Sequence, residues 1–147
     1  MNFIEGIQYK LISKMGFKYY DEDKYLIQEC LKHVTKKNPK VLDVGCGTGH
    51  HSLLFEKYGA DVTAFDYDEN VIEKAKEKKI KINSNVNFLI ADGRYPEKYF
   101  TDKYDIIFMA GFSIFGIDLN KAVMKKYLNM LAKGGILVLV HNSNLTG

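Results

Sequence analysis

The chain has 147 residues, of which 46% are hydrophobic and 27% are charged. This length and balance predict one globular domain with a substantial core, too small to include a separate substrate domain. Its formal net charge of +3, with Lys and Glu interleaved, argues against nucleic acid as a partner.

The cysteines and the apolar runs bear on location. Cys30 and Cys46 have neither CxxC nor metal-ligand spacing, which favours a reducing compartment and no metal site. The sequence begins without a signal-peptide pattern, and its apolar runs fall short of the roughly 18 residues of a membrane span. We therefore expect a cytoplasmic protein with no membrane partner.

The first segment, residues 1–37, is expected to form a helical arm. Ile4, Ile7 and Leu11 have the spacing of one helical face, and a second helix follows them. Aromatic residues cluster in this segment and have no obvious strand to join. We therefore expect residues 1–20 to close over the ligand site as a lid; the alternative is a helix packed on the flank of the sheet.

Residues 38–147 alternate between apolar strands and helices and are expected to form the core. The five expected strands are Lys40–Val44, Asp61–Phe65, Val86–Ile90, Tyr104–Ala110 and Ile136–Val140. The last helix is expected from about Leu119 to Leu131, capped by Asp118 and ended by Gly134-Gly135. This alternation indicates an α/β domain with a doubly wound, mostly parallel sheet. Right-handed crossovers then give the strand order 3-2-1-4-5.

A glycine turn follows the first strand. Gly45, Gly47 and Gly49 alternate along it, and such a turn before a helix lets a ligand approach the backbone closely. Asp43 precedes the turn and would repel a pyrophosphate, whereas it suits a ligand with an ammonium and a sulfonium. The sequence lacks GKS and GKT, so the turn is not a P-loop. An NAD site that uses Asp66 for the ribose is the alternative.

Acidic residues follow the next two strands. Asp66 lies in FDYD, after the second strand, and Asp92 lies in ADGR, after the third. Ligands of doubly wound sheets bind beyond the carboxyl ends of the strands. An acid at each position suits a nucleoside, because ribose hydroxyls and the adenine amine are donors that need acceptors.

The ordered motifs resemble those of one family. VLDVGCGTG, FDYD, ADG, YDIIFMAG and LAKGGILVLV follow one another between Lys40 and Val140, and this set resembles that of class I S-adenosylmethionine-dependent methyltransferases. The resemblance implies a Rossmann-like methyltransferase fold, S-adenosyl-L-methionine as cofactor and S-adenosyl-L-homocysteine as product. The cofactor-binding residues that it implies are Asp43, Gly45, Cys46, Gly47, Gly49, Asp66, Tyr67, Asp92, Gly93 and Met109.

The resemblance also implies a role for each position. The glycine turn would wrap the methionine part of the cofactor, and Asp43 would serve its amino group. Asp66 would bind the ribose hydroxyls, and Tyr67 would lie against the adenine. Asp92 would accept from the adenine amine, and Met109 would line the methionine arm.

Departures from the family bear on the acceptor. The sequence has no NPPY or DPPY after the fourth strand, the motif of family members that methylate exocyclic amines of nucleic-acid bases or glutamine. It also has no Pro-Cys nucleophile, which members that methylate C5 of cytosine carry. The apolar sequence that follows this strand instead suits a small-molecule acceptor. A neutral acceptor can also need a base, for which His141 at the end of the fifth strand is the best-placed candidate, with His50 and His51 behind it.

The resemblance implies two further strands after the fifth, and the sequence ends soon after Val140. Ile136–Val140 would then be an edge strand of five aliphatic residues, which is prone to pair with other chains. We expect either a piece of a longer protein or a homodimer through this edge, with cofactor binding surviving better than turnover. Beside the small-molecule methyltransferase and the NAD-dependent oxidoreductase, the third hypothesis is a cofactor-binding module without catalysis.

Overall fold

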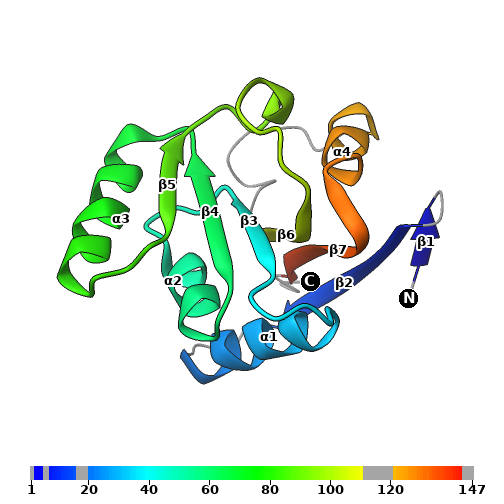
Figure 1. Ribbon diagram of the computed structural model, residues 1–147, viewed down its shortest axis with the longest axis horizontal. Helices are drawn as coiled ribbons and strands as arrows, with labels where there is room; N and C mark the ends of the chain where they lie inside the picture. The colour runs from blue at the N-terminus through cyan, green and yellow to red at the C-terminus, as the bar shows by residue number, and fades with distance from the viewer. Residues whose placement is uncertain (1, 5–6, 16–19, 111–120, 144–147) are drawn as a thin grey trace.

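The computed structural model describes residues 2–4, 7–15, 20–110 and 121–143 (Figure 1). Its strands are β1 (Asn2–Ile4), β2 (Ile7–Met15), β3 (Lys40–Val44), β4 (Asp61–Asp66), β5 (Asn87–Ile90), β6 (Tyr104–Ala110) and β7 (Leu131–Ser143). Its helices are α1 (Tyr20–Lys32), α2 (His50–Lys57), α3 (Glu69–Lys81), α4 (Lys121–Leu128) and the short 3-10 helix η1 (Pro96–Lys98). The strands form one sheet in the order β1-β2-β7-β6-β3-β4-β5.

Five of these strands confirm the predicted sheet. β5, β4, β3, β6 and β7 are parallel neighbours, which is the order 3-2-1-4-5 expected for a doubly wound domain. β3 lies in the middle, where Leu42 pairs with Thr63 on one side and with Ile107 on the other. A central parallel strand is covered on both faces, so an uninterrupted apolar run is the sequence that forms it.

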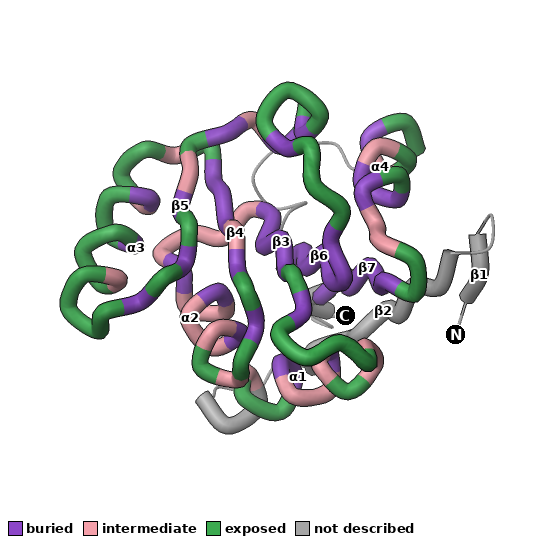
Figure 2. Tube along the Cα trace, viewed as in Figure 1, coloured by how far each residue is buried: buried purple, intermediate pink, exposed green. Residues whose placement is uncertain are grey.

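The central strands β3 and β6 are buried along most of their length (Figure 2). Helices cover the two faces of the sheet and create two separate cores. On one face, α1, α2 and α3 bury apolar side chains against Val41, Ile106 and Phe108. On the other face, α4 packs against Leu42 and Ile107. Alternate residues of β3 and β6 thus point to opposite cores, which fixes the register of the central strands.

The structure corrects the expectation of a helix in the first 16 residues. Residues 2–4 and 7–15 are strands, and β2 runs parallel to β7 from Gln8, paired with Ile136, to Met15, paired with Ser143. The sequence IQYKLISKM places apolar residues at alternate positions as well as at helical spacing, and the edge of β7 provides unpaired backbone groups. Pairing with that edge decides between the two periods.

This pairing has consequences for two other expectations. Residues 7–15 extend the sheet rather than covering a ligand site, so the lid expectation is wrong for them; residues 16–19 lie outside the described part. β7 is paired on both sides, by β6 and β2, so its edge is not open and the reason for expecting a homodimer there disappears. No strand follows β7 within the described residues.

The boundary between α4 and β7 also differs from the expectation. The helix ends at Leu128, before the glycines, and Gly134 and Gly135 lie within β7. A Cβ on Gly135 would lie 2.9 Å from the carbonyl oxygen of Tyr104, so only glycine permits this close approach of β7 to β6. The expected cap, Asp118, lies outside the described residues.

The helices of residues 20–110 and 121–143 include none with the length and apolar character needed to cross a bilayer.

Candidate cofactor site

The glycine turn begins directly after β3 and leads into α2. Gly45, Gly47 and Gly49 have φ angles of 67°, 56° and 87°, which are left-handed conformations that favour glycine. A Cβ on Gly49 would lie 2.6 Å from the ring of Phe88, whereas a Cβ on Gly47 would have no neighbour within 4 Å. Gly49 is therefore needed for packing, and Gly47 leaves space on the outer side of the turn for a ligand.

Asp66, at the end of β4, holds the turn in place. Its Oδ2 accepts a hydrogen bond from the backbone N–H of Gly47 at 3.0 Å, and its Oδ1 accepts from the N–H of Asp68 at 3.0 Å. The residue is 6% exposed. Because a carboxylate has about four lone-pair sites, each oxygen keeps acceptor capacity for a ligand hydroxyl.

Asp43, near the end of β3, is a buried carboxylate with a hydroxyl partner. It is 2% exposed, and Ser52 of α2 donates to its Oδ2 at 2.6 Å. Burial raises the pKa of Asp43 above its ordinary value, and the neighbouring His51 and the Ser52 hydroxyl act against this shift. A carboxylate in this position would be stabilised by a cationic ligand at the turn.

Asp92, after β5, is paired with a neighbour in the same loop. Arg94 donates from Nε to Oδ1 at 3.0 Å and from Nη2 to Oδ2 at 2.7 Å. These hydrogen bonds and the backbone N–H of Arg94 hold the pKa of Asp92 below its ordinary value. The carboxylate therefore stays ionised and able to accept from a donor such as an exocyclic amine.

Helix α4 fixes this loop from the opposite face of the sheet. The buried Tyr127 hydroxyl donates to the carbonyl oxygen of Gly93 at 2.5 Å, and Lys126 donates to the carbonyl oxygen of Arg94 at 3.0 Å. Burial is the main cause that raises the pKa of Tyr127, so the hydroxyl keeps its proton. The backbone beside Asp92 is thus held by two side chains far away in the sequence.

The remaining sequence-predicted site residues divide into three groups. Tyr67 is 53% exposed next to Asp66, as a side chain available for stacking would be. Met109 is 1% exposed and packed in the α4 core, and Cys46 is half-buried with its Sγ 3.5 Å from the carbonyl oxygen of Gly47. The side chain of His141 lies outside the described part of the structure.

Comparison with known protein families identifies the family of this chain. The family model described as "Methyltransferase domain" matches residues 41–135, which covers more than half of the chain. The chain belongs to the class I S-adenosylmethionine-dependent methyltransferases. This membership confirms the resemblance seen in the sequence motifs and decides against the NAD site left open by the glycine turn.

Individual relatives of this methyltransferase domain agree with the assignment. Phosphoethanolamine N-methyltransferase 1 of Zea mays is 30% identical over 146 residues, which cover 91% of this chain and 28% of that protein. The domain thus spans less than a third of the length of that relative. The crystal structure of TehB from Haemophilus influenzae matches with a TM-score of 0.65 and 29% identity, covering 78% of this chain and 39% of that one.

A third relative bears on the cofactor. The crystal structure of the plantazolicin methyltransferase BpumL, in complex with a triazolic desmethylPZN analog and SAH, has a TM-score of 0.57 and 26% identity, and the match covers 76% of this chain and 42% of that one. Membership of the class I S-adenosylmethionine-dependent methyltransferases makes S-adenosyl-L-methionine the cofactor of this domain. The SAH bound to that relative agrees with S-adenosyl-L-homocysteine as the product. The residues at the strand ends fit this cofactor, since the open side of Gly47 and the carboxylates of Asp43, Asp66 and Asp92 match its cationic and donor groups.

Three features of the methyltransferase site were not evident in the sequence. Ser52 is a polar residue of α2 whose partner, Asp43, lies in the preceding strand. Tyr127 belongs to the apolar face of α4, and its partner, Gly93, is far away in the sequence. Asp23 of α1 contacts both His50 and His51 of α2. Tertiary packing, which no local signal reports, brings each of these side chains to its partner. The described part of the chain has no group of three His, Cys, Asp or Glu side chains arranged to hold a metal ion.

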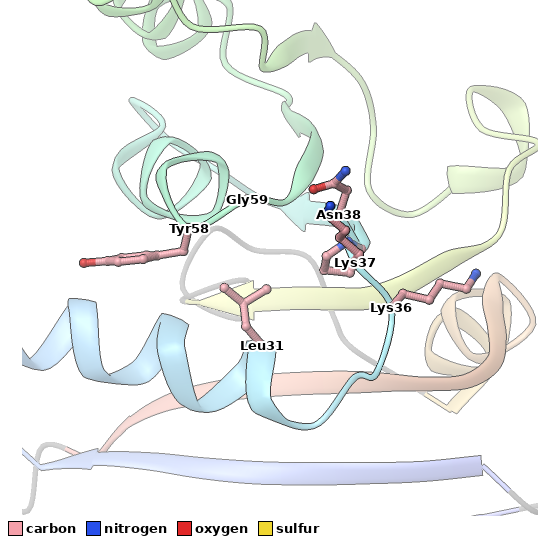
Figure 3. A pocket seen from close by; sticks show the side chains of 7 residues that line it. Leu31, Lys36, Lys37, Asn38, Tyr58 and Gly59 are labelled. Atoms are coloured by element: carbon pink, nitrogen blue, oxygen red, sulfur yellow. The ribbon is translucent and has the colours of Figure 1, made fainter.

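A small cavity lies at the opposite edge of the sheet (Figure 3). Its volume is about 240 Å³, and it is lined by Leu31, Lys36, Lys37, Asn38, Pro39, Tyr58 and Gly59. These residues precede β3 and β4, whereas the glycine turn follows β3. Lys36 is also paired with Asp105, at the start of β6, at 3.1 Å. The cavity therefore lies at the amino ends of the strands, away from the cofactor site.

Proposed function

We propose that this domain transfers a methyl group from S-adenosyl-L-methionine to a small-molecule acceptor. The observation that supports it best is the shared position of Asp43, Asp66 and the open glycine turn at the carboxyl edge of β3 and β4. The similarity to the maize phosphoethanolamine N-methyltransferase over 91% of the chain supports a small acceptor. The modest net charge of +3 agrees, since it provides little attraction for nucleic acid.

Each site residue has a defined part in this proposal. The glycine turn would hold the methionine part, with Asp43 opposite its ammonium, and Asp66 would accept from the ribose hydroxyls. Tyr67 would pack on the adenine, and Asp92 would accept from its amine. The bound cofactor supplies an activated methyl group on a sulfonium, so the protein contributes mainly positioning and exclusion of water.

Calorimetric titration with S-adenosyl-L-homocysteine tests the cofactor site. Replacement of Asp66 by Asn should weaken binding by about 1.5–3 kcal/mol, the contribution of a charge-assisted hydrogen bond, or roughly 10- to 150-fold in Kd. Asp61→Asn is the matched control, since Asp61 is an exposed aspartate at the other end of β4. Equal affinities of the two variants would show that the ribose site has been misplaced.

A turnover assay separates an enzyme from a binding module. Purified protein with S-adenosyl-L-methionine should methylate members of a panel of small acceptors that includes phosphoethanolamine, primary amines, phenols and carboxylates. Product is measured as S-adenosyl-L-homocysteine. Tight binding of S-adenosyl-L-homocysteine with no turnover of any acceptor would instead favour a cofactor-binding module that needs another chain.

A further inference from the structure

Three polar side chains from two helices form a cluster beside the glycine turn. His50 Nε2 lies 3.1 Å from Oδ2 of Asp23, and His51 Nε2 lies 3.3 Å from Oδ1 of the same carboxylate. The side chain of Asp23 is 13% exposed, while those of His50 and His51 are 40% and 24% exposed. A largely buried carboxylate of α1 is thus shared by two imidazoles at the start of α2, and both rings keep access to solvent.

The carboxylate sets the tautomer of the two rings. An ionised carboxylate can only accept, so the hydrogen bonds to Asp23 assign the ring proton of each neutral imidazole to Nε2. The other nitrogen, Nδ1, then has a lone pair that can accept a proton. No other described residue supplies a hydrogen bond to Nδ1 of His51.

His51 also borders the cofactor site. Its ring packs on Phe108 of β6, with 5.2 Å between the ring centroids, and Phe108 lies in the carboxyl-terminal half of that strand. His51 lies close enough to Asp43 to act against the rise in the pKa of that carboxyl. His51, the second residue of α2, thus lies near Asp43 of β3 and Phe108 of β6.

Charges around His51 select the kind of acceptor that this cluster could bind. The charged or titratable side chains that face it are Asp23 from α1, His50 from α2 and Asp43 from β3, while Phe108 from β6 is uncharged, as far as the described residues extend. Asp23 attracts a cation and repels an anion. An ammonium group is attracted by the carboxylate and can donate to the imidazole lone pair.

We propose that His51, oriented by Asp23, is the general base of methyl transfer and that the acceptor is an amine. This proposal rests on the proposed function and deepens it. An amine enters as an ammonium, which has no lone pair, so it must lose a proton before it can react. His51 Nδ1 takes that proton and becomes an imidazolium that Asp23 stabilises. The freed nitrogen lone pair forms the new C–N bond, while the C–S bond breaks and its electron pair stays on the sulfur.

Kinetics on the best amine of the acceptor panel provide the first test. His51→Gln keeps a side-chain donor for Asp23 but cannot take up a proton. We expect it to lower kcat by about 100-fold or more, with the Kd of S-adenosyl-L-homocysteine unchanged and the acidic limb of the pH–rate profile lost. His33→Gln, the same change beyond the other end of α1, should leave kcat and the pH profile unchanged.

Imidazole NMR of the wild-type protein loaded with S-adenosyl-L-homocysteine is the second test, and it depends on no turnover. Ethanolamine should shift the His51 signal, whereas choline, which has no N–H group, should leave it in place. Asp23→Asn should abolish the shift, and the His33 signal should not move. An equal response to choline, or a shift that survives Asp23→Asn, would overturn the proposal.

The outcomes separate this inference from the proposed function. If wild-type protein does not bind S-adenosyl-L-homocysteine, the proposed function fails. If it binds and methylates only phenols or carboxylates, or if His51→Gln keeps full activity on an amine, the proposed function stands and the general base is wrong.

Discussion

The glycine turn offers a pair of substitutions that should separate stability from binding. Gly47 and Gly49 both have positive φ, so an alanine at either costs about 1–2 kcal/mol in backbone strain. At Gly49 the new Cβ would also lie 2.6 Å from the ring of Phe88, which is 3% exposed and has little room to move. Overpacking adds about 1–3 kcal/mol. Gly49→Ala should therefore destabilise the domain by roughly 2–5 kcal/mol, and Gly47→Ala only by the backbone strain of about 1–2 kcal/mol.

Affinity should respond in the opposite order. The Cβ of Gly47→Ala meets no protein atom within 4 Å and points into the space proposed for the methionine part of the cofactor, so this variant should bind S-adenosyl-L-homocysteine at least 10-fold more weakly. Urea unfolding and calorimetric titration measure the two quantities; in a domain of this size 1 kcal/mol corresponds to about 2–4 °C in Tm. If Gly47→Ala were the less stable variant, or bound the ligand normally, the description of this turn would be incorrect.

Three further predictions concern other parts of the domain. Because burial raises the pKa of Asp43 above 3.8, the folded protein holds this proton more tightly than the unfolded chain, and the stability of the ligand-free protein falls as pH rises through the folded pKa. Asp43→Asn should therefore gain stability relative to wild type, measured by urea unfolding, as the pH rises from acidic to neutral; a loss at neutral pH would contradict this. Tyr127→Phe removes the donor to the carbonyl oxygen of Gly93 and should cost about 1–3 kcal/mol in thermal unfolding, with weaker cofactor binding; unchanged stability would mean that the hydrogen bond is replaced by water. Of two adjacent β2 residues only one donates its N–H to β7, so one of the two variants Leu11→Pro and Ile12→Pro should unpair β2 from β7. The exposed strand edge should then cause concentration-dependent association in light scattering, and monomeric behaviour of both variants would argue against the pairing.

The sequence predicted the parallel core because each of its central strands carries its own signal. β3 and β6 are apolar runs whose neighbours on both faces are helices, so burial alone determines them. The glycine turn and the acids that follow β4 and β5 could be placed from spacing, and the family match supports the cofactor that they suggested. Their individual roles stay predictions.

The N-terminal segment shows where such reading fails. Residues 7–15 fit both a helical and an alternating pattern, and the choice depends on a strand edge at the other end of the sequence. The pairs Ser52–Asp43 and Asp23–His51 are similar, because a hydroxyl or a carboxylate on a helix gives no indication of the residue it will meet. Contacts between distant segments are the part that local pattern cannot supply.

The parallel pairing of β2 with β7 places a constraint on the order of folding. Gln8 is synthesised long before its partner Ile136. During synthesis β2 can pair only with the short β1, while β3, β4, β5 and β6 can already pair with one another. Closing so long a loop is entropically costly and slow, so docking of β2 should be a late step of folding. Until β2 docks, its edge and the edge of β7 are unpaired and can associate with other nascent chains. Chaperones that bind extended segments would then bind at these two strands.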